Sequence, residues 1–185
     1  MILTRERMIQ IKFLGRGGQG VVVASEILAR ACFEENLYPQ CFSLYGGERR
    51  GATVAAFVRV DQKKIYLKCN IDRPDHLILF DKSLFNEKEV AVQVDPGGHL
   101  LLNSEENHLF NGLEAFKVGR IDALEISKKN GLGAIVNTAI LGAYVRLTNI
   151  ISLDTLLRVI SETVPAAADQ NVMAAKEAYE RLSVV

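Results

Sequence analysis

The spacing of apolar positions changes several times along the chain, and each change marks an expected element. Residues 8–14 form a short apolar run typical of a buried strand, and residues 21–31 space their apolar side chains as a packed helix does. Between them lies a loop rich in glycine. A second strand is expected at residues 40–44, and a third at residues 53–60, where the sequence is β-rich and alternating.

Further strands are expected in the middle of the chain. After the turn "DQKK", residues 65–68 are predicted to return beside residues 53–60 as an antiparallel hairpin. The apolar run "DHLILFD" suits a buried strand, "VAVQVDPGGHLLLN" predicts two strands around a Pro-Gly-Gly turn, and "AFKVGR" predicts one more. A hairpin beside buried strands indicates a mixed sheet.

The second half of the chain is predicted to be helical. Gly131 is expected to end the first of these helices, Ser152 to cap the third, and Ile135 to lie in the buried second one. The four helices cover residues 121–129, 134–147, 152–164 and 170–182. The fold class is therefore α/β: a mixed β-sheet with packing helices and a Rossmann-like first strand, loop and helix. Residues 1–185 are expected to form a single domain.

Composition narrows the class of protein. The chain has 185 residues, 49% of them hydrophobic, which is enough for one substantial core. Twenty-two basic residues balance twenty-two acidic ones, so no overall field attracts nucleic acid or an anionic membrane. No stretch reaches the roughly 18 apolar residues of a membrane span, and the first residues do not resemble a signal peptide. A soluble, cytoplasmic protein is expected.

The glycine-rich loop "GRGGQG" is the first candidate site. Gly15, Gly17 and Gly20 fit the spacing G-x-G-x-x-G, and Gly18 is an additional glycine. Glycines permit positive φ angles, and the start of a helix offers unpaired N–H groups to an anion. The acidic residue that a dinucleotide site needs about 20 positions later is missing. A dinucleotide, another phosphate-bearing ligand and a purely structural turn all remain open.

The loop "YGGERRGA" is the second candidate site. Arg49 and Arg50 are adjacent and flanked by glycines, so they could bind a carboxylate or phosphate, with Glu48 orienting one of them. The same residues could instead form an exposed charged turn or dock against a partner subunit.

The sequence shows no pattern typical of a metal site or of a catalytic residue. Cys32, Cys41 and Cys69 are far apart, and neither an iron–sulfur cluster nor a structural zinc ion can be held by such spacing. Asn137 lies in an apolar segment, either as a core amide with its partners or as a ligand contact. No catalytic residue and no metal ligand can be nominated. The chain therefore resembles a ligand-binding or assembly domain rather than a complete enzyme.

Four segments together resemble one protein family. They read "FLGRGGQGVVVASEILARA", "YGGERRGATVAAFVRV", "DHLILFD" and "NTAILGAYVRLTNIISLDTLLRVI". In this order, and over nearly the whole chain, they are similar to the gamma subunit, or gamma domain, of 2-oxoacid:ferredoxin oxidoreductases that act on pyruvate, 2-oxoisovalerate or 2-oxoglutarate. The pair G-x-G-G-Q-G and E-x-R-G-A is far more specific than either motif alone.

The resemblance implies a role inside a larger enzyme. In this family the complex cleaves a 2-oxoacid on thiamine diphosphate, passes electrons through iron–sulfur clusters to ferredoxin, and releases acyl-coenzyme A. The thiamine diphosphate and the clusters belong mainly to other subunits. The chain is therefore expected to be a non-catalytic gamma subunit that holds neither group alone. Its expected partners are alpha, beta and delta-type subunits, with ferredoxin reached through the complex.

The resemblance also assigns roles to both loops. The glycine loop would bind coenzyme A or pack closely against another subunit, which concerns Gly15, Gly17, Gly18, Gln19 and Gly20. The second loop would face substrate or subunits, which concerns Glu48, Arg49, Arg50 and Gly51. Gly47 stands where 2-oxoglutarate-type members have proline, but Tyr45 and Gly46 match them, so the substrate stays open. Alternatives are a free-standing nucleotide-binding protein and the related subunit of indolepyruvate ferredoxin oxidoreductase.

Overall fold

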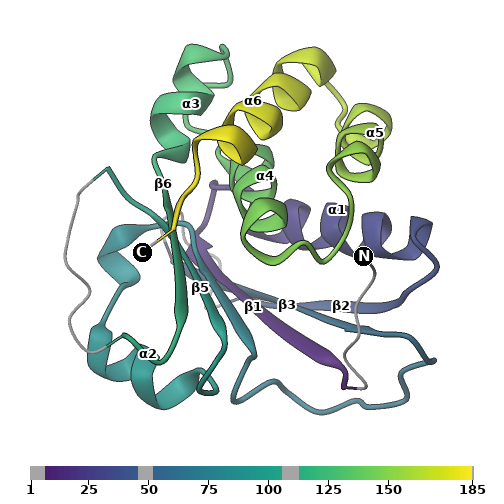
Figure 1. Ribbon diagram of the computed structural model, residues 1–185. Helices are drawn as coiled ribbons and strands as arrows, with labels where there is room; N and C mark the ends of the chain where they lie inside the picture. Colours follow the sequence, from purple (N-terminus) through teal and green to yellow (C-terminus); the bar gives the residue numbers. More distant parts are fainter. Residues whose placement is uncertain (1–6, 46–51, 106–112, 185) are drawn as a thin grey trace.

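The computed structural model describes residues 7–45, 52–105 and 113–184, which form seven strands and six helices (Figure 1). In chain order they are β1 (Ile9–Arg16), α1 (Val21–Glu34), β2 (Tyr38–Tyr45), β3 (Thr53–Asp61), β4 (His76–Leu79), α2 (Glu87–Gln93), β5 (His99–Asn103), β6 (Lys117–Ile121), α3 (Ala123–Lys129), α4 (Asn137–Thr148), α5 (Leu153–Thr163), α6 (Ala168–Arg181) and β7 (Ser183–Val184). A 3-10 turn, η1 (Lys82–Leu84), follows β4.

All seven strands join one mixed sheet in the order β2-β3-β1-β4-β5-β6-β7. The strands β1, β4, β5 and β6 run parallel to one another. In contrast, β3 is antiparallel to both β1 and β2, and β7 is antiparallel to β6. The carboxyl ends of β1 and β4 therefore meet at one edge of the sheet, next to the start of α1.

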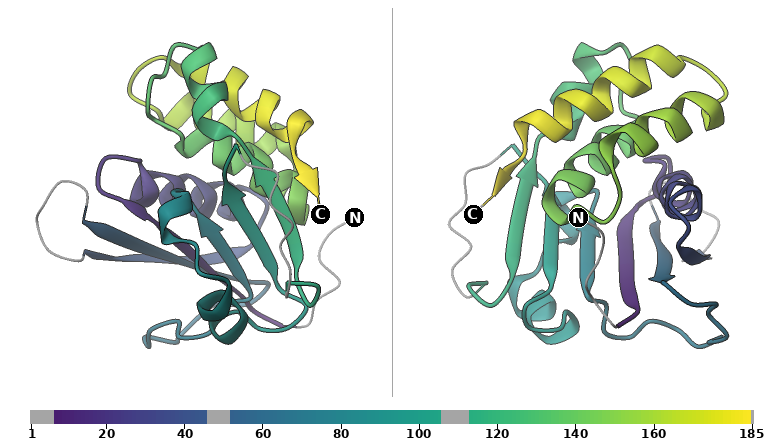
Figure 2. Two further views of the ribbon diagram at one scale, coloured as in Figure 1. Left: turned by 90° about the vertical axis from the view of Figure 1, so that its left-hand side faces the viewer. Right: turned by 45° about the vertical axis from the view of Figure 1, so that its right-hand side comes forward.

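The two faces of the sheet are covered differently. The helices α1, α3, α4, α5 and α6 lie on one face, and α2 lies on the other (Figures 1 and 2). Successive side chains of β4 point to opposite faces of the sheet. Ile78 points to the larger core, whereas Leu77 and Leu79 point toward α2. Val90 of α2 and Val94, the residue directly after this helix, close the smaller core.

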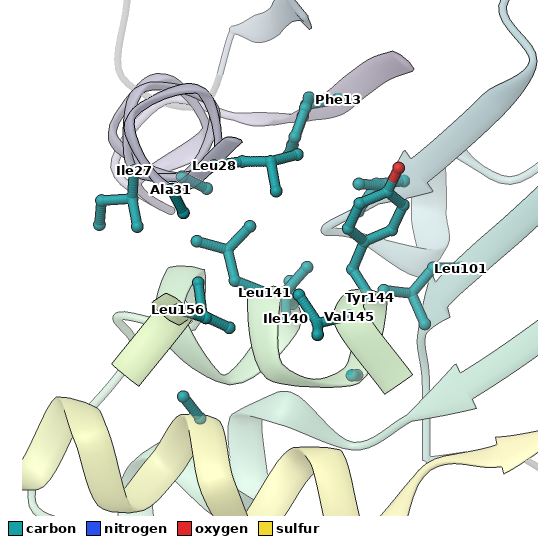
Figure 3. Close-up of a cluster of buried hydrophobic side chains, with 14 of the residues drawn as sticks. Phe13, Ile27, Leu28, Ala31, Leu101, Ile140, Leu141, Tyr144, Val145 and Leu156 are labelled. Atoms are coloured by element: carbon teal, nitrogen blue, oxygen red, sulfur yellow. The ribbon is translucent and has the colours of Figure 1, made fainter. Parts of the chain in front are cut away.

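Helix α4 is the centre of the larger core. It is buried along nearly its whole length and packs against α6, α5 and α1. Figure 3 shows Leu141 and Tyr144 of α4 among side chains from α1, α5 and the sheet. Gly142 lets α6 approach closely, since a Cβ atom there would lie only 2.6 Å from the carbonyl carbon of Ala175.

Two of the expected strands are wrong. Residues 65–68 form no strand, because β3 already pairs with β1 on one side and β2 on the other, leaving no free edge. The segment "VAVQV" is mostly helix α2. Asn86 caps this helix by accepting hydrogen bonds from the N–H groups of Lys88 and Glu89. Val90 and Val94, four residues apart, are buried, whereas Val92 is 72% exposed, so the true period is helical.

The helical half follows the expectation closely. Ser152 caps α5 through the N–H of Thr155, and Gly131 follows the end of α3 with φ +77°. Helix α4 begins at residue 137 instead of 134, after Gly133 with φ +63°. Ile135 therefore precedes the helix and is 49% exposed, which contradicts its predicted burial. The short edge strand β7 was not expected.

Candidate functional site

The glycine loop connects β1 to α1 at the carboxyl edge of the parallel strands. Gly18 has φ +97°, and Gly20, the residue before α1, has φ +78°. The N-cap residue, Gly20, has no side chain that could cap the start of α1, and the first turn of the helix contains no acidic residue. The first N–H groups of a helix have no partner within the helix. The start of α1 is therefore suited to an anion in both geometry and charge.

The glycines of this loop have different roles. A Cβ atom on Gly15 would lie 2.8 Å from Cβ of Phe80, and one on Gly20 would lie 2.9 Å from Nδ2 of Asn137. Both glycines are therefore required by close packing. Gly18 is exposed, and a Cβ atom there would meet nothing within 4 Å among the residues that the structure describes. None of the described residues therefore blocks the approach of a ligand to Gly18.

Gln19 shapes the loop from inside. Its Oε1 accepts a hydrogen bond from the N–H of Arg16 at 2.8 Å, and its Nε2 donates to Asp81 at 3.4 Å. Asp81 follows β4 and forms an ion pair with Nε of Arg16 at 3.2 Å. Burial opposes ionisation of Asp81, but the hydrogen bonds from Ser83 and the charge of Arg16 outweigh it and lower the pKa of this carboxyl. These contacts connect the glycine loop to Asp81, which follows β4.

A crevice of about 210 Å³ lies next to Gln19 and Asp81, at the ends of β4 and β5. Its lining includes three carboxylates, from Asp81, Glu105 and Asp122. Nζ of Lys82 forms an ion pair with Oε1 of Glu105 at 3.1 Å. Oδ1 of Asp122 accepts a hydrogen bond from the N–H of Glu125. Because carboxylates outnumber cations in this lining, an anionic group is better placed at the tip of the glycine loop than in the crevice.

The second motif is anchored next to the first. Glu48, Arg49, Arg50 and Gly51 lie outside the described residues, but the positions that flank them are placed. The N–H of Gly17 donates to the carbonyl oxygen of Ala52 at 3.0 Å. In the sheet register, Arg16 is opposite Thr53, and Val54 lies between Gly15 and Tyr45. Antiparallel pairing of β1 with β3 therefore brings together two motifs that are about 30 residues apart, which no local pattern reveals.

The remaining candidates lie elsewhere. Cys32 lies on the buried side of α1, where burial raises the pKa of its thiol to about 12, whereas Cys41 lies on β2 and Cys69 on the connection after β3. Asn137 is 5% exposed, and its Oδ1 accepts a hydrogen bond from the N–H of Thr138. Its side chain packs against Gly20 of the glycine loop. No cluster of three potential metal ligands occurs within the described ranges.

Comparison with known proteins decides the family. Residues 10–181 match the family model described as pyruvate ferredoxin/flavodoxin oxidoreductase. The chain belongs to this family. It is 40% identical to pyruvate synthase subunit PorC of Methanothermobacter marburgensis, over 95% of this chain and 98% of that protein. It is 39% identical to the common gamma subunit of the pyruvate/ketoisovalerate oxidoreductases of Thermococcus kodakarensis, over 96% and 98% of the two chains.

A solved structure agrees with these relatives. The pyruvate oxidoreductase subunit PORC from Thermotoga maritima is 29% identical and superposes with a TM-score of 0.84, over 97% of this chain and 99% of that one. The expected α/β fold with a mixed sheet and the expected subunit of a 2-oxoacid:ferredoxin oxidoreductase are thereby confirmed. A free-standing nucleotide-binding protein and an indolepyruvate enzyme subunit are not favoured. No helix among the placed residues is both long and apolar enough to cross a membrane.

Proposed function

We propose that the chain is the non-catalytic gamma subunit of a cytoplasmic complex that oxidatively decarboxylates a 2-oxoacid, such as pyruvate, to acyl-coenzyme A and reduces ferredoxin. Thiamine diphosphate and the iron–sulfur clusters reside on the alpha, beta and delta-type partners. The end-to-end match to relatives named as pyruvate synthase and gamma subunits supports this role. The three dispersed cysteines of this chain agree with clusters carried by other subunits.

The glycine loop contributes a phosphate contact to coenzyme A in the assembled enzyme. The observation that supports this site is that none of the described residues fills the space in front of Gly18, at the start of α1, where the N-cap residue Gly20 has no side chain. Gly15 and Gly20 hold the loop close to β4 and α4, Gln19 braces it from inside, and Gly17 joins it to Ala52. The loop with Glu48, Arg49 and Arg50 joins Tyr45 to Ala52, and in this proposal it contacts substrate or a neighbouring subunit.

Substitution of Gly18 by valine tests the phosphate contact. The new side chain fills the open space, so the Michaelis constant for coenzyme A should rise about tenfold, while that for the 2-oxoacid changes little. A lost charge-assisted hydrogen bond of about 1.5–3 kcal/mol corresponds to a factor of about 10 to 150, so tenfold is the lower end of the expected change. Gly131→Val is the matched control, because Gly131 also has a positive φ and open space around it but lies between α3 and α4. The control separates backbone strain from loss of the ligand contact.

The assay is steady-state kinetics on the reconstituted complex, with assembly checked by gel filtration. If Gly18→Val assembles normally and leaves the coenzyme A dependence unchanged, the loop is a structural corner. Arg50→Ala should raise the same Michaelis constant only if its loop reaches the coenzyme A phosphate groups. The subunit role itself is tested separately: the purified chain alone should not reduce methyl viologen with 2-oxoacid and coenzyme A, and a pull-down should recover thiamine- and ferredoxin-type chains.

A further inference from the structure

The outer face of the sheet, opposite α4, has two differently covered halves. Helix α2 packs over the half formed by β4, β5 and β6. The half formed by β2, β3 and β1 is crossed near one end by residues 67–70 of the long β3–β4 connection (Figure 1). There Gln10, Arg59 and Gln40 stand opposite one another on three neighbouring strands. A cation thus occupies the middle strand, beneath this connection.

Arg59 is a completely buried cation with 0% exposed surface. Its Nε donates to Oε1 of Gln10 at 3.3 Å, and its Nη1 donates to Oε1 of Gln40 at 2.8 Å. Its Nη2 donates to the carbonyl oxygens of Cys69 at 2.6 Å and Asn70 at 3.2 Å. All these oxygens are neutral, and no carboxylate in the described part of the chain forms an ion pair with it. Buried arginines are usually paired with an anion, so this charge lacks its usual compensation.

A cavity of about 320 Å³ lies beside this cation. Its lining includes the buried Arg59, the exposed Lys68, the ring of Phe42, and Gln40 and Asn70. The guanidinium carbon of Arg59 lies 5.3 Å from the centre of the Phe42 ring. No aspartate or glutamate lines the cavity within the described ranges. The cavity therefore combines two positive charges with an aromatic wall, and its size is near the lower end of the range for small-molecule sites, about 300–1,000 Å³.

We propose that this cavity binds a small organic anion, consisting of a carboxylate on an apolar body. The carboxylate pairs with the ammonium group of Lys68, and the apolar body lies against Phe42. Arg59 is covered, so it attracts the anion through its charge rather than through direct contact. An inorganic anion would satisfy the charges but would gain nothing from the apolar surface of Phe42.

Fluorobenzoate is a suitable probe, and fluorobenzamide is its neutral control of nearly the same shape. In NMR titrations of the nitrogen-labelled full chain, fluorobenzoate should shift the backbone amide signals of Phe42, Lys68 and Asn70 in a saturable manner. Fluorobenzamide should bind at least about threefold more weakly, because it lacks the charge that Lys68 and Arg59 attract. This comparison needs no variant, so it does not depend on any mutant folding.

Three substitutions locate the charge. Lys68→Gln should weaken fluorobenzoate binding about threefold, and Asn70→Asp, which adds a negative charge to the lining, should weaken it by a similar or larger factor. Lys63→Gln is the matched control, because Lys63 is an exposed lysine of the same connection that does not line the cavity. All three positions are exposed, so the unfolding temperature should change little.

Several results would overturn the proposal: no saturable shift with fluorobenzoate, equal binding of fluorobenzamide, or an equal effect of Lys63→Gln and Lys68→Gln. A carboxylate could also come from an acidic side chain of a partner subunit. Fluorine NMR on the assembled complex distinguishes this source. Continued binding of fluorobenzoate supports a site for a free small anion, whereas loss of binding on assembly means that a partner fills the cavity and refutes it.

Discussion

Replacement of Gly142 by alanine tests how closely α4 and α6 pack. Gly142 is in the middle of α4 and faces α6. A Cβ atom at this position would overlap the carbonyl oxygen of Ala175 and lie 2.6 Å from its carbonyl carbon and 2.9 Å from its Cα. These are backbone atoms of a helix, so no side-chain rotation relieves the overlap. The two helices must move apart, and α4 also carries Asn137, which packs against Gly20 of the glycine loop.

Two effects of opposite sign compete in this variant. Alanine is favoured over glycine inside a helix by about 1 kcal/mol. Overpacking of a well-packed core costs about 1–3 kcal/mol, occasionally more, and an overlap with backbone belongs at the upper end of this range. The free energy of unfolding should therefore fall by about 2 kcal/mol. For a domain of this size, such a loss lowers the melting temperature by roughly 4–8 °C.

Urea unfolding followed by circular dichroism measures the change. Ser161→Ala is the control for helix propensity, because Ser161 is on the exposed side of α5 and alanine adds no atom there. This control should leave stability unchanged or raise it by a few tenths of a kcal/mol. A rise in the stability of Gly142→Ala by about 1 kcal/mol would mean that propensity wins. The close approach of α4 and α6 would then be refuted.

Two further predictions concern ionisation. The pKa of Glu177 is lowered from its ordinary 4.5 to about 2, and the hydrogen bond from Lys129 is the largest cause. The ionised carboxylate therefore stabilises the folded state above pH 4.5, and this contribution disappears as the pH falls through about 2. In Glu177→Gln, the free energy of unfolding, measured by urea unfolding at stepped pH, should fall less steeply between pH 4.5 and about 2. An unchanged pH dependence would contradict the lowered pKa of Glu177. In native protein, a thiol reagent such as dithionitrobenzoate should label the exposed Cys69 readily. It should label Cys41 more slowly, because burial raises the pKa of that thiol, and the buried Cys32 only after unfolding. Equal labelling rates would contradict this order.

Local patterns in the sequence determined most of the elements. Residues 8–14 and 21–31 mark β1 and α1, because a buried strand and a packed helix impose periods that can be seen in one segment. Ser152 and Gly131 mark helix ends, since capping depends on one residue and its own backbone. Four segments in order, among them the motifs of both loops, were also sufficient to indicate the family to which the chain belongs.

Where two periods compete, the sequence was not decisive. "VAVQV" alternates as a strand does, but its first and last valines also fit one face of a helix, and the cap at Asn86 together with the space under β4 and β5 selects the helix. Residues 65–68 have strand-like composition, but strand formation requires a free edge, and β3 has none. Such outcomes depend on which partners are available in space.

The sites depended even more on tertiary structure. The sequence indicated that the glycine loop and the arginine loop matter, but only the pairing of β1 with β3 places Gly17 against Ala52 and joins the two motifs at their bases. Arg59 is an ordinary alternating residue in the sequence, and its burial follows from the crossing of residues 67–70 over β3. The physical reason is the same in both cases: periodicity and capping are local interactions, whereas strand order and burial arise from contacts between residues far apart in the chain.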